Sequence, residues 1–165
     1  MLELSGLSKH FGGVRAVDNI DLKVGRGDIV GLIGPNGSGK STIVNLICGF
    51  FPPTAGKVLF DGKDITSLPT HVRVGMGIAR TFQNIRLFGQ LSVWQNLWVA
   101  QNSDKQRGDG SFLRRWLGAP GAARAEVDRT LEFFNLAQKR DELAANLSFG
   151  EQRRLEMARA LAANP

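Results

Sequence analysis

The stretch that most constrains this chain is Gly34–Thr42, which reads Gly-Pro-Asn-Gly-Ser-Gly-Lys-Ser-Thr. It fits the pattern G-x-x-x-x-G-K-[ST], in which a glycine-rich loop turns its backbone N–H groups around a phosphate. Glycine permits that turn because it has no Cβ to obstruct it. The Lys40 ammonium is expected to reach the β- and γ-phosphates, and the Ser41 hydroxyl to hold Mg²⁺. The candidate phosphate-binding residues are therefore Gly34, Pro35, Asn36, Gly37, Ser38, Gly39, Lys40, Ser41 and Thr42.

The flanks of this loop match the strand–loop–helix context that the motif requires. The preceding run Asp28–Ile33 predicts a short, fully buried strand. A helix that starts at the loop would add its own N–H groups and dipole to the phosphate site. Its buried face is predicted by four apolar side chains at the spacing i, i+3, i+4, i+7: Ile43, Leu46, Ile47 and Phe50. The alternative, a glycine-rich turn without a ligand, is disfavoured by this context.

Composition narrows the class of protein. A chain of 165 residues that is 42% hydrophobic can bury a core, and we expect one domain with at most a subdomain beside it. The formal charge of +6 invites a nucleic-acid partner. However, the arginines are scattered among acidic residues, with only short doublets at Arg114–Arg115 and Arg153–Arg154. We therefore expect no nucleic acid, and a basic face near a phospholipid surface or a membrane partner fits the charge better.

The single cysteine, Cys48, excludes an intramolecular disulfide and indicates a reducing compartment. Its place in the apolar helix favours a small core residue over a reactive thiol. No apolar stretch approaches the length of a membrane span, and the N-terminus has no signal-peptide pattern. These features predict a cytoplasmic protein whose membrane association comes through a partner.

The residues around the loop predict a β-rich N-terminal part. Alternation at Leu2–Leu4 and at Ile20–Val24 predicts strands, with a loop at Lys9–Gly13 between them. Phe11 in that loop is a candidate for stacking on adenine, and packing beneath a turn is the alternative. After the helix, Lys57–Ile65 predicts a hairpin around its Asp-Gly turn, and residues 70–77 predict a short helix.

A second buried strand is predicted at Gly77–Gln83. Ligands of α/β sheets gather at the carboxyl ends of strands, so Gln83 is expected to meet the same nucleotide. Taken alone, a glutamine after a strand is more often a solvated loop residue.

From about residue 91 the pattern becomes helical. One stripe predicts a core-facing helix around Leu91–Trp98, and another spans Val127–Phe134. Between them, residues 101–123 are polar and glycine-rich and predict a loop with room for a short helix at its apolar island, Phe112, Leu113, Trp116 and Leu117. A final helix runs through Leu155–Ala162. Ser148 and Glu151 before it have the form of a capping box, or alternatively of an anion site at a helix N-terminus.

This ordered set of motifs resembles the ATP-binding cassette (ABC) ATPases over essentially the whole chain. In that family, Phe11 matches the adenine-stacking aromatic. Residues 34–42 match the Walker A loop and Gln83 the Q-loop glutamine. Leu147–Glu151 matches the signature sequence, although Glu151 stands where the family often has glutamine.

Beyond the shared motifs, the detailed sequence of four segments resembles one ATP-binding subunit of branched-chain amino-acid importers. The resemblance lies in four segments, Phe11–Val17, Asn45–Phe50, Ile78–Phe88 and Leu147–Leu161. It implies that the parent protein couples ATP hydrolysis to uptake of these amino acids. Another ABC system, such as a lipopolysaccharide-export ATPase, and a non-transport cassette acting on DNA or ribosomes are the alternatives.

The resemblance implies an α/β fold, a P-loop NTPase core of the ABC type with an N-terminal antiparallel β subdomain and a helical signature subdomain. It implies a nucleotide-binding core at 1–88 and the helical subdomain at 89–165. ATP and Mg²⁺ are the implied cofactors, with Lys40 and Gln83 as catalytic residues and Ser41 and Gln83 near the metal. Val17 and Phe11 are expected at the nucleotide, whereas Ser148, Gly150 and Glu151 are expected to act in trans.

The implied partners are membrane-spanning permease subunits, a second ATP-binding subunit in a homo- or heterodimer, and, indirectly, a periplasmic amino-acid-binding protein. The implied location is the inner face of the plasma membrane. The family continues into a Walker B strand, a catalytic glutamate and a switch histidine, which do not occur before Pro165. We therefore expect that the C-terminal part of the core is missing, and that residues 1–165 bind nucleotide without competent hydrolysis and are prone to aggregation.

Overall fold

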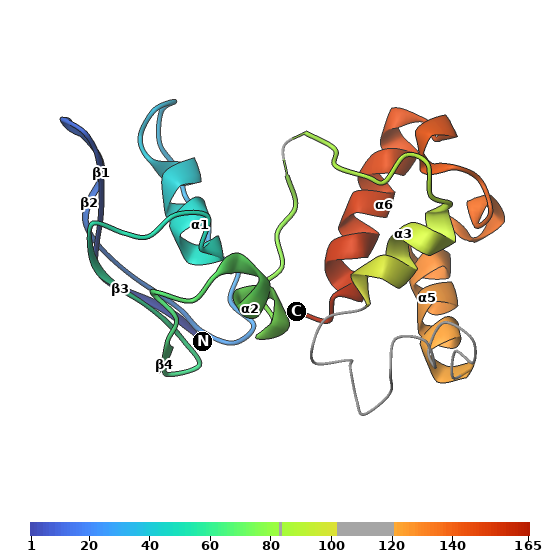
Figure 1. Ribbon diagram of the computed structural model, residues 1–165, viewed down its shortest axis with the longest axis horizontal. Helices are drawn as coiled ribbons and strands as arrows, with labels where there is room; N and C mark the ends of the chain where they lie inside the picture. The colour runs from blue at the N-terminus through green and yellow to red at the C-terminus, as the bar shows by residue number, and fades with distance from the viewer. Residues whose placement is uncertain (83, 102–120) are drawn as a thin grey trace. The chain divides into compact units, whose positions relative to one another are not determined.

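A computed structural model describes residues 1–82, 84–101 and 121–165 (Figure 1). The chain divides into two compact units, Met1–Arg73 and Val74–Pro165. The first unit carries the glycine-rich loop and the second carries Ser148. The predicted boundary at residues 88 and 89 stays a prediction. Among the described residues, no helix combines the length and apolar character needed to cross a membrane.

The first unit contains a four-stranded antiparallel sheet in the order β2-β1-β3-β4. Its strands are β1 (Leu2–Phe11), β2 (Val14–Val24), β3 (Ala55–Phe60) and β4 (Lys63–Asp64). The predicted strands at residues 2–4 and 20–24 are confirmed, and both are longer than predicted. The predicted loop at Lys9–Gly13 is wrong for its first three residues, because cross-strand pairing extends to Phe11 and Val14 and only two glycines remain for the turn.

The predicted hairpin through the Asp-Gly turn is confirmed between β3 and β4. Asp61 has φ 47° and Gly62 has φ 76°. Two consecutive residues with positive φ are the requirement of a type I′ turn, whose twist matches that of the flanking strands.

Helix α1 (Lys40–Cys48) follows the glycine-rich loop, as predicted. It ends because Gly49 adopts the left-handed conformation, with φ 75°, and donates its N–H back into the last turn. Ile43, Leu46 and Cys48 are buried, whereas Phe50 lies beyond the helix and is 49% exposed. Helix α2 (Thr70–Gly75) confirms the short helix predicted at 70–77.

A buried arginine on α2 holds the carboxyl end of α1. The Arg73 side chain donates to the carbonyl oxygens of Leu46 at 2.7 Å and Ile47 at 2.8 Å. It also donates to those of Thr66 and Leu68, both at 2.8 Å. The last carbonyls of a helix have no intrahelical partner, so the guanidinium satisfies them. Its positive charge also interacts favourably with the negative end of the helix dipole. Burial lowers the pKa of this guanidinium below its ordinary value.

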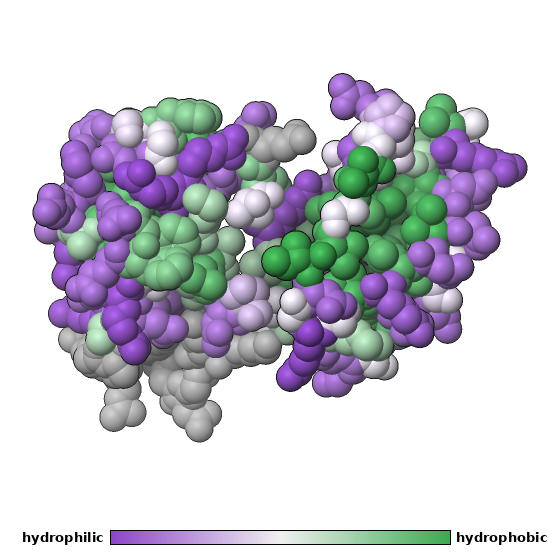
Figure 2. Space-filling model, turned by 180° about the vertical axis from the view of Figure 1, so that it is seen from behind, coloured by the Kyte–Doolittle hydropathy of each residue, from purple (hydrophilic) through white to green (hydrophobic). Residues whose placement is uncertain are grey.

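Two predicted buried strands are wrong. Residues 28–33 form no regular element, and Ile29 and Ile33 are 101% and 98% exposed. An apolar run becomes a buried strand only when neighbouring strands pair with its backbone, and the described sheet places none beside it. The first unit exposes apolar side chains over a broad area in the right half of Figure 2. Residues 78–82 likewise lack strand structure, and Gln83 lies outside the described residues.

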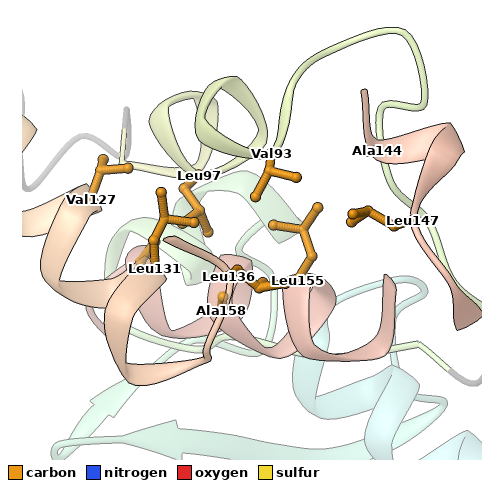
Figure 3. Packing of buried hydrophobic residues seen from close by; sticks show 10 residues of the cluster. Val93, Leu97, Val127, Leu131, Leu136, Ala144, Leu147, Leu155 and Ala158 are labelled. Carbon is orange, nitrogen blue, oxygen red and sulfur yellow. The ribbon is translucent and has the colours of Figure 1, made fainter. Parts of the chain in front are cut away.

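The second unit packs helices α3 (Val93–Ala100), α5 (Gly121–Phe133) and α6 (Phe149–Ala162) around one apolar cluster (Figure 3). Short 3-10 turns, η2 (Ala137–Lys139) and η3 (Ala144–Asn146), connect the last two helices. The cluster confirms the predicted helical stripes, and its members are Val93, Leu97, Val127, Leu131, Leu136, Ala144, Leu147, Leu155, Ala158 and Ala162.

The edge of this core carries a pair of stacked indoles. The ring centroids of Trp94 and Trp98 lie 5.0 Å apart, and the angle between the ring planes is 15°. Since α5 begins at Gly121, the end of the predicted loop at 101–123 is helical instead. The remainder of that loop, with its apolar island, lies at residues 102–120, outside the described residues.

A close backbone approach inside the sheet gives a matched pair of variants. Gly56 has φ 84°, and a Cβ added there would lie 2.3 Å from the Gly6 carbonyl oxygen. Gly62 has a similar φ of 76°, but an added Cβ would meet nothing within 4 Å. Gly62→Ala is expected to cost about 1 kcal/mol for its conformation alone. Gly56→Ala is expected to lose a further 1–3 kcal/mol or so, because backbone must move. Urea unfolding measures both, and equal losses would contradict the role of this approach.

Candidate functional site

The glycine-rich loop is an open turn anchored on the sheet. Gly37 and Gly39 have φ 84° and 83°, in the left-handed region that favours glycine. A Cβ on Gly39 would lie 2.3 Å from the carbonyl oxygen of Ala16 on β2. Glycine is therefore required at position 39 both for its conformation and for the contact between the loop and β2.

The Lys40 ammonium lies within the loop that precedes it. Its Nζ donates to the carbonyl oxygens of Gly34 at 2.7 Å and Pro35 at 2.6 Å, and to Ser38 Oγ at 3.3 Å. These three contacts hold the flexible Lys40 side chain against the backbone of the loop. The structure thus places the ammonium against the loop, and its contact with the β- and γ-phosphates stays a prediction.

The start of α1 supplies further groups for an anion. Gly39 is its N-cap, no side chain accepts a hydrogen bond there, and the first turn has no acidic residue. The first N–H groups of a helix lack intrahelical partners and lie at the positive end of its dipole. Together with the lysine ammonium, they make this loop an anion site suited to phosphate. Ser41 is exposed in the same turn, so its hydroxyl is accessible.

A hydroxyl oxygen suits Mg²⁺, which prefers oxygen ligands and takes several of them from substrate phosphates and water. The described residues contain no group of three or more His, Cys, Asp or Glu side chains that could hold a metal by themselves. The exposed Ser41 hydroxyl has the oxygen chemistry that suits a metal shared with a bound phosphate. The other predicted metal residue, Gln83, lies outside the described residues.

Val17 and Phe11 lie in different environments of the first unit, Val17 buried and Phe11 partly exposed. Val17 is 5% exposed, and its Cγ2 would lie 3.4 Å from a Cβ on Gly39. The buried Val17 side chain therefore packs next to the loop at Gly39. Phe11 ends β1, is 47% exposed and packs edge to face on Phe51 with ring centroids 5.3 Å apart. Val17 is thus close to the phosphate loop, while Phe11 retains a free surface on which a base can stack.

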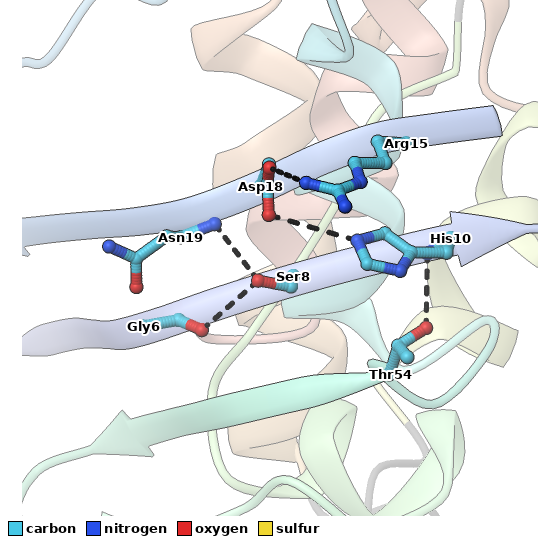
Figure 4. Close-up of polar contacts among 7 residues, drawn as sticks. All are labelled: Gly6, Ser8, His10, Arg15, Asp18, Asn19 and Thr54. Carbon is cyan, nitrogen blue, oxygen red and sulfur yellow. Dashed lines mark hydrogen bonds and ion pairs between the residues drawn. The ribbon is translucent and has the colours of Figure 1, made fainter.

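Polar contacts fix the hairpin end that carries Phe11 (Figure 4). Asp18 accepts a hydrogen bond from Arg15 Nη1 at 3.2 Å and lies 3.7 Å from His10 Nε2. The His10 N–H donates to Thr54 Oγ1 at 3.0 Å, which joins β1 to the start of β3. A further bridge between β1 and β2 runs through Ser8 Oγ, which accepts from the Asn19 N–H at 2.9 Å.

The signature stretch forms the N-terminus of α6 in the second unit. Ser148 is the N-cap, and its backbone N–H donates to Glu151 Oε2 at 2.8 Å. The Ser148 hydroxyl donates to the same oxygen at 2.7 Å and accepts from the Glu151 N–H at 3.4 Å. The predicted capping box is confirmed, and its hydroxyl proton already has an acceptor within the chain.

Gly150 differs from the glycines of the sheet. A Cβ added there would meet nothing within 4 Å in the described part of the chain. Gly150 also does not have a positive φ, so neither its backbone conformation nor packing against the described residues requires glycine at this position. An exposed helix N-terminus without a side chain leaves room for another group to approach.

Sequence reasoning missed the groups that hold the start of the Q-loop. The Phe82 N–H donates to Glu156 Oε1 at 3.2 Å, and Arg153 Nη1 donates to the Phe82 carbonyl oxygen at 3.1 Å. Arg153 Nη1 also contacts Glu156 Oε2 at 3.1 Å. Glu156 is only 6% exposed, so this ion pair on α6 fixes the residue before Gln83. No local pattern signals it, because the partners are more than seventy residues apart.

A cavity of about 230 Å³ lies beside this ion pair. Its lining combines apolar side chains with three arginines, Arg80, Arg86 and Arg159. Its lining, which belongs to the second unit, includes none of the predicted phosphate-binding residues.

A profile of the family described as "ABC transporter" matches residues 17–165, which include the loop, the Q-loop segment and the signature stretch. The chain belongs to the ABC transporter family.

Relatives of this ABC chain carry informative names. The high-affinity branched-chain amino acid transport ATP-binding protein BraF of Pseudomonas aeruginosa PAO1 is 40% identical over 171 aligned residues. LivG of Escherichia coli K12, whose name describes the same kind of protein, is also 40% identical over 171 residues. Each alignment covers 100% of this chain and 66% of the relative. The ABC chain described here thus spans just under two thirds of the length of these relatives.

Solved structures of ABC cassettes share its fold. The ADP conformation of MJ1267, an ATP-binding cassette of an ABC transporter, has a TM-score of 0.82 at 34% identity and covers 100% of this chain and 65% of that one. A dimeric post-hydrolysis state of the cassette MJ0796, bound to ADP and Pi, has a TM-score of 0.77 at 28% identity. That comparison covers 100% of this chain and 71% of that one. The α/β fold with an antiparallel β subdomain is therefore confirmed as the ABC type.

The capping box predicts a pH dependence of stability. Hydrogen bonds from the Ser148 hydroxyl, then from its backbone N–H, hold the pKa of Glu151 below its ordinary value of 4.5. A lowered folded-state pKa means that ionised Glu151 stabilises the fold above its unfolded pKa. This contribution is lost as the pH falls through the lowered value. Glu151→Gln keeps a capping side chain but cannot titrate, so its urea midpoint is expected to fall less between pH 6 and acid than that of the wild type. Parallel curves for the two proteins would refute this.

Proposed function

We propose that this chain is the nucleotide-binding part of an ATP-driven importer of branched-chain amino acids. The observation that carries the nucleotide site is the position of Lys40, whose ammonium lies 2.6 Å and 2.7 Å from two carbonyls of the loop at the start of α1. The transport role is supported by the names of relatives that are 40% identical over the whole chain.

In the proposed site, the Lys40 ammonium exchanges part of its loop contacts for the β- and γ-phosphates. The N–H groups at the start of α1 stabilise the same charge without reorganisation, because the helix already holds them in place. The Ser41 hydroxyl would hold Mg²⁺, which neutralises phosphate charge when bound. Gln83 is proposed to complete the metal site and to sense the γ-phosphate.

We propose a second, trans half of the site at Ser148, Gly150 and Glu151. The absence of any described neighbour within 4 Å of a Cβ on Gly150 supports this role, since the position is open to an incoming phosphate. The post-hydrolysis structure of the cassette MJ0796, bound to ADP and Pi, is dimeric, which supports pairing for this chain as well.

The proposed partners are membrane-spanning permease subunits on the inner face of the plasma membrane, supplied with substrate by a periplasmic amino-acid-binding protein. Nucleotide binding at residues 34–42 would bias a two-state element that includes the Q-loop. The ion pair of Arg153 and Glu156 is well placed to transmit this bias, because it holds Phe82 next to Gln83.

Lys40→Ala tests the nucleotide site. Loss of a charge-assisted contact is expected to weaken ATP binding by about tenfold or more, as measured by calorimetry with the purified chain. Lys63→Ala is the matched control, because it removes an exposed lysine of β4 in the same unit. If both variants bound ATP as tightly as the wild type, the loop would not be the nucleotide site.

The transport role is tested in the complete complex reconstituted in vesicles with permeases and binding protein. Lys40→Ala is expected to abolish ATP-dependent leucine uptake, because the energy source can no longer bind productively. The Lys63→Ala complex is expected to retain it. Leucine uptake that survives Lys40→Ala, or a wild-type complex that transports only unrelated solutes, would disprove the proposal.

A further inference from the structure

An aromatic cluster beside Phe11 is not explained by a role for Phe11 alone. The Phe51 ring meets the Phe11 ring edge to face, with centroids 5.3 Å apart and an interplanar angle of 85°. Lys9 Nζ lies 5.2 Å from the Phe11 centroid and 5.3 Å from the Phe51 centroid. The same ammonium donates to the Pro52 carbonyl oxygen at 2.7 Å. Two rings and one cation thus contact each other at the end of the hairpin.

We propose that Phe51 and Lys9 are positioning residues that orient Phe11 as a stacking surface for the nucleotide base. This inference rests on the proposed nucleotide site and deepens it by naming what holds the base. Phe11 contacts the base, while the other two act only through Phe11. We call the three side chains the base platform.

The backbone that carries Phe51 is locked to the strand that carries Phe11. The Thr54 N–H donates to the Ser8 carbonyl oxygen at 2.8 Å, and the His10 N–H donates to Thr54 Oγ1 at 3.0 Å. Two residues further on, Gly56 approaches the backbone of β1 so closely that no Cβ fits. The contacts at Thr54 and Gly56 therefore hold the segment that follows Phe51 against the strand that carries Phe11.

The base platform is also tied to the phosphate loop through α1. Phe51 follows the left-handed cap at Gly49 by two residues, and the Arg73 guanidinium holds the last carbonyls of that helix. The start of α1 carries the groups proposed to bind phosphate, and Phe51 follows the end of the same helix. A shift of α1 would therefore change both the phosphate contacts and the base contact.

The platform recognises an aromatic base without reading its edges. Stacking is tolerant of sequence because every base has a π-face. Phe11 is 47% exposed, which leaves ring surface for a base. The cation contacts the rings of the platform, where it strengthens the pair electrostatically. We therefore expect nucleoside triphosphates as a class, with ATP and GTP affected alike by changes in the platform.

The test compares three probes with the full chain: ATP, GTP and tripolyphosphate, which has no base. Phe51→Ala is expected to weaken ATP and GTP binding by about 3- to 10-fold, because edge-to-face pairs contribute on that scale. Tripolyphosphate affinity is expected to stay unchanged, which a merely structural defect would not allow. Phe51→Leu keeps apolar volume without a ring and guards against misfolding. Phe133→Ala, which removes a phenylalanine 75% exposed in the second unit, is the matched control and should change nothing.

The inference is overturned if Phe51→Ala and Phe51→Leu bind ATP like the wild type, or if they weaken tripolyphosphate to the same extent. It is also overturned if Phe11→Ala leaves ATP affinity unchanged while Lys40→Ala weakens all three probes, and then the proposed nucleotide site stands. If Lys40→Ala changes none of the three affinities, the proposed function itself fails. Lys9→Met is expected to give a smaller loss than Phe51→Ala, confined to the two nucleotides.

Discussion

A buried guanidinium on α2 holds the carboxyl end of α1, the helix that Gly49 terminates. Placing a charge out of water is costly unless hydrogen bonds compensate for it. The Arg73 side chain, 1% exposed, meets this requirement with four carbonyl oxygens, two of them from the last turn of α1. Gly49 lets the guanidinium approach, because a Cβ there would lie 2.7 Å from Arg73 Nε. Glycine and arginine are thus both needed for this one contact.

Consequences of that contact reach both ends of the helix. The N-terminus of α1 is anchored on β2 at Gly39, and its C-terminus is anchored by Arg73, so the helix is restrained along its full length. A preorganised helix presents its N–H groups to an anion without paying to order them at the moment of binding. Phe51 follows the helix cap by two residues, so its backbone starts from a fixed position. The proposed phosphate and base contacts therefore depend on a common support.

The second unit uses its polar groups differently. Ser148 and Glu151 satisfy each other in a capping box, and the box stabilises α6 before any partner is present. Arg153 and Glu156, one turn further along, hold Phe82. One helix thus carries both the signature residues and the support for the chain next to Gln83. No described residue comes within 4 Å of a Cβ added at Gly150, which supports the proposed trans contact there.

Local chemistry determined much of what the sequence predicted correctly. The glycine-rich loop, the Asp61–Gly62 turn, the capping box at Ser148 and the stripes of the core helices each depend on residues a few positions apart. The strands predicted at 28–33 and 77–83 were wrong, since a buried strand needs hydrogen-bonding neighbours that its own sequence does not specify. Arg73 and Phe51 were missed for a related reason, because their partners lie in other segments. The sequence by itself therefore determined the chemistry of the phosphate loop, whereas the tertiary structure alone decided which distant groups hold it in place.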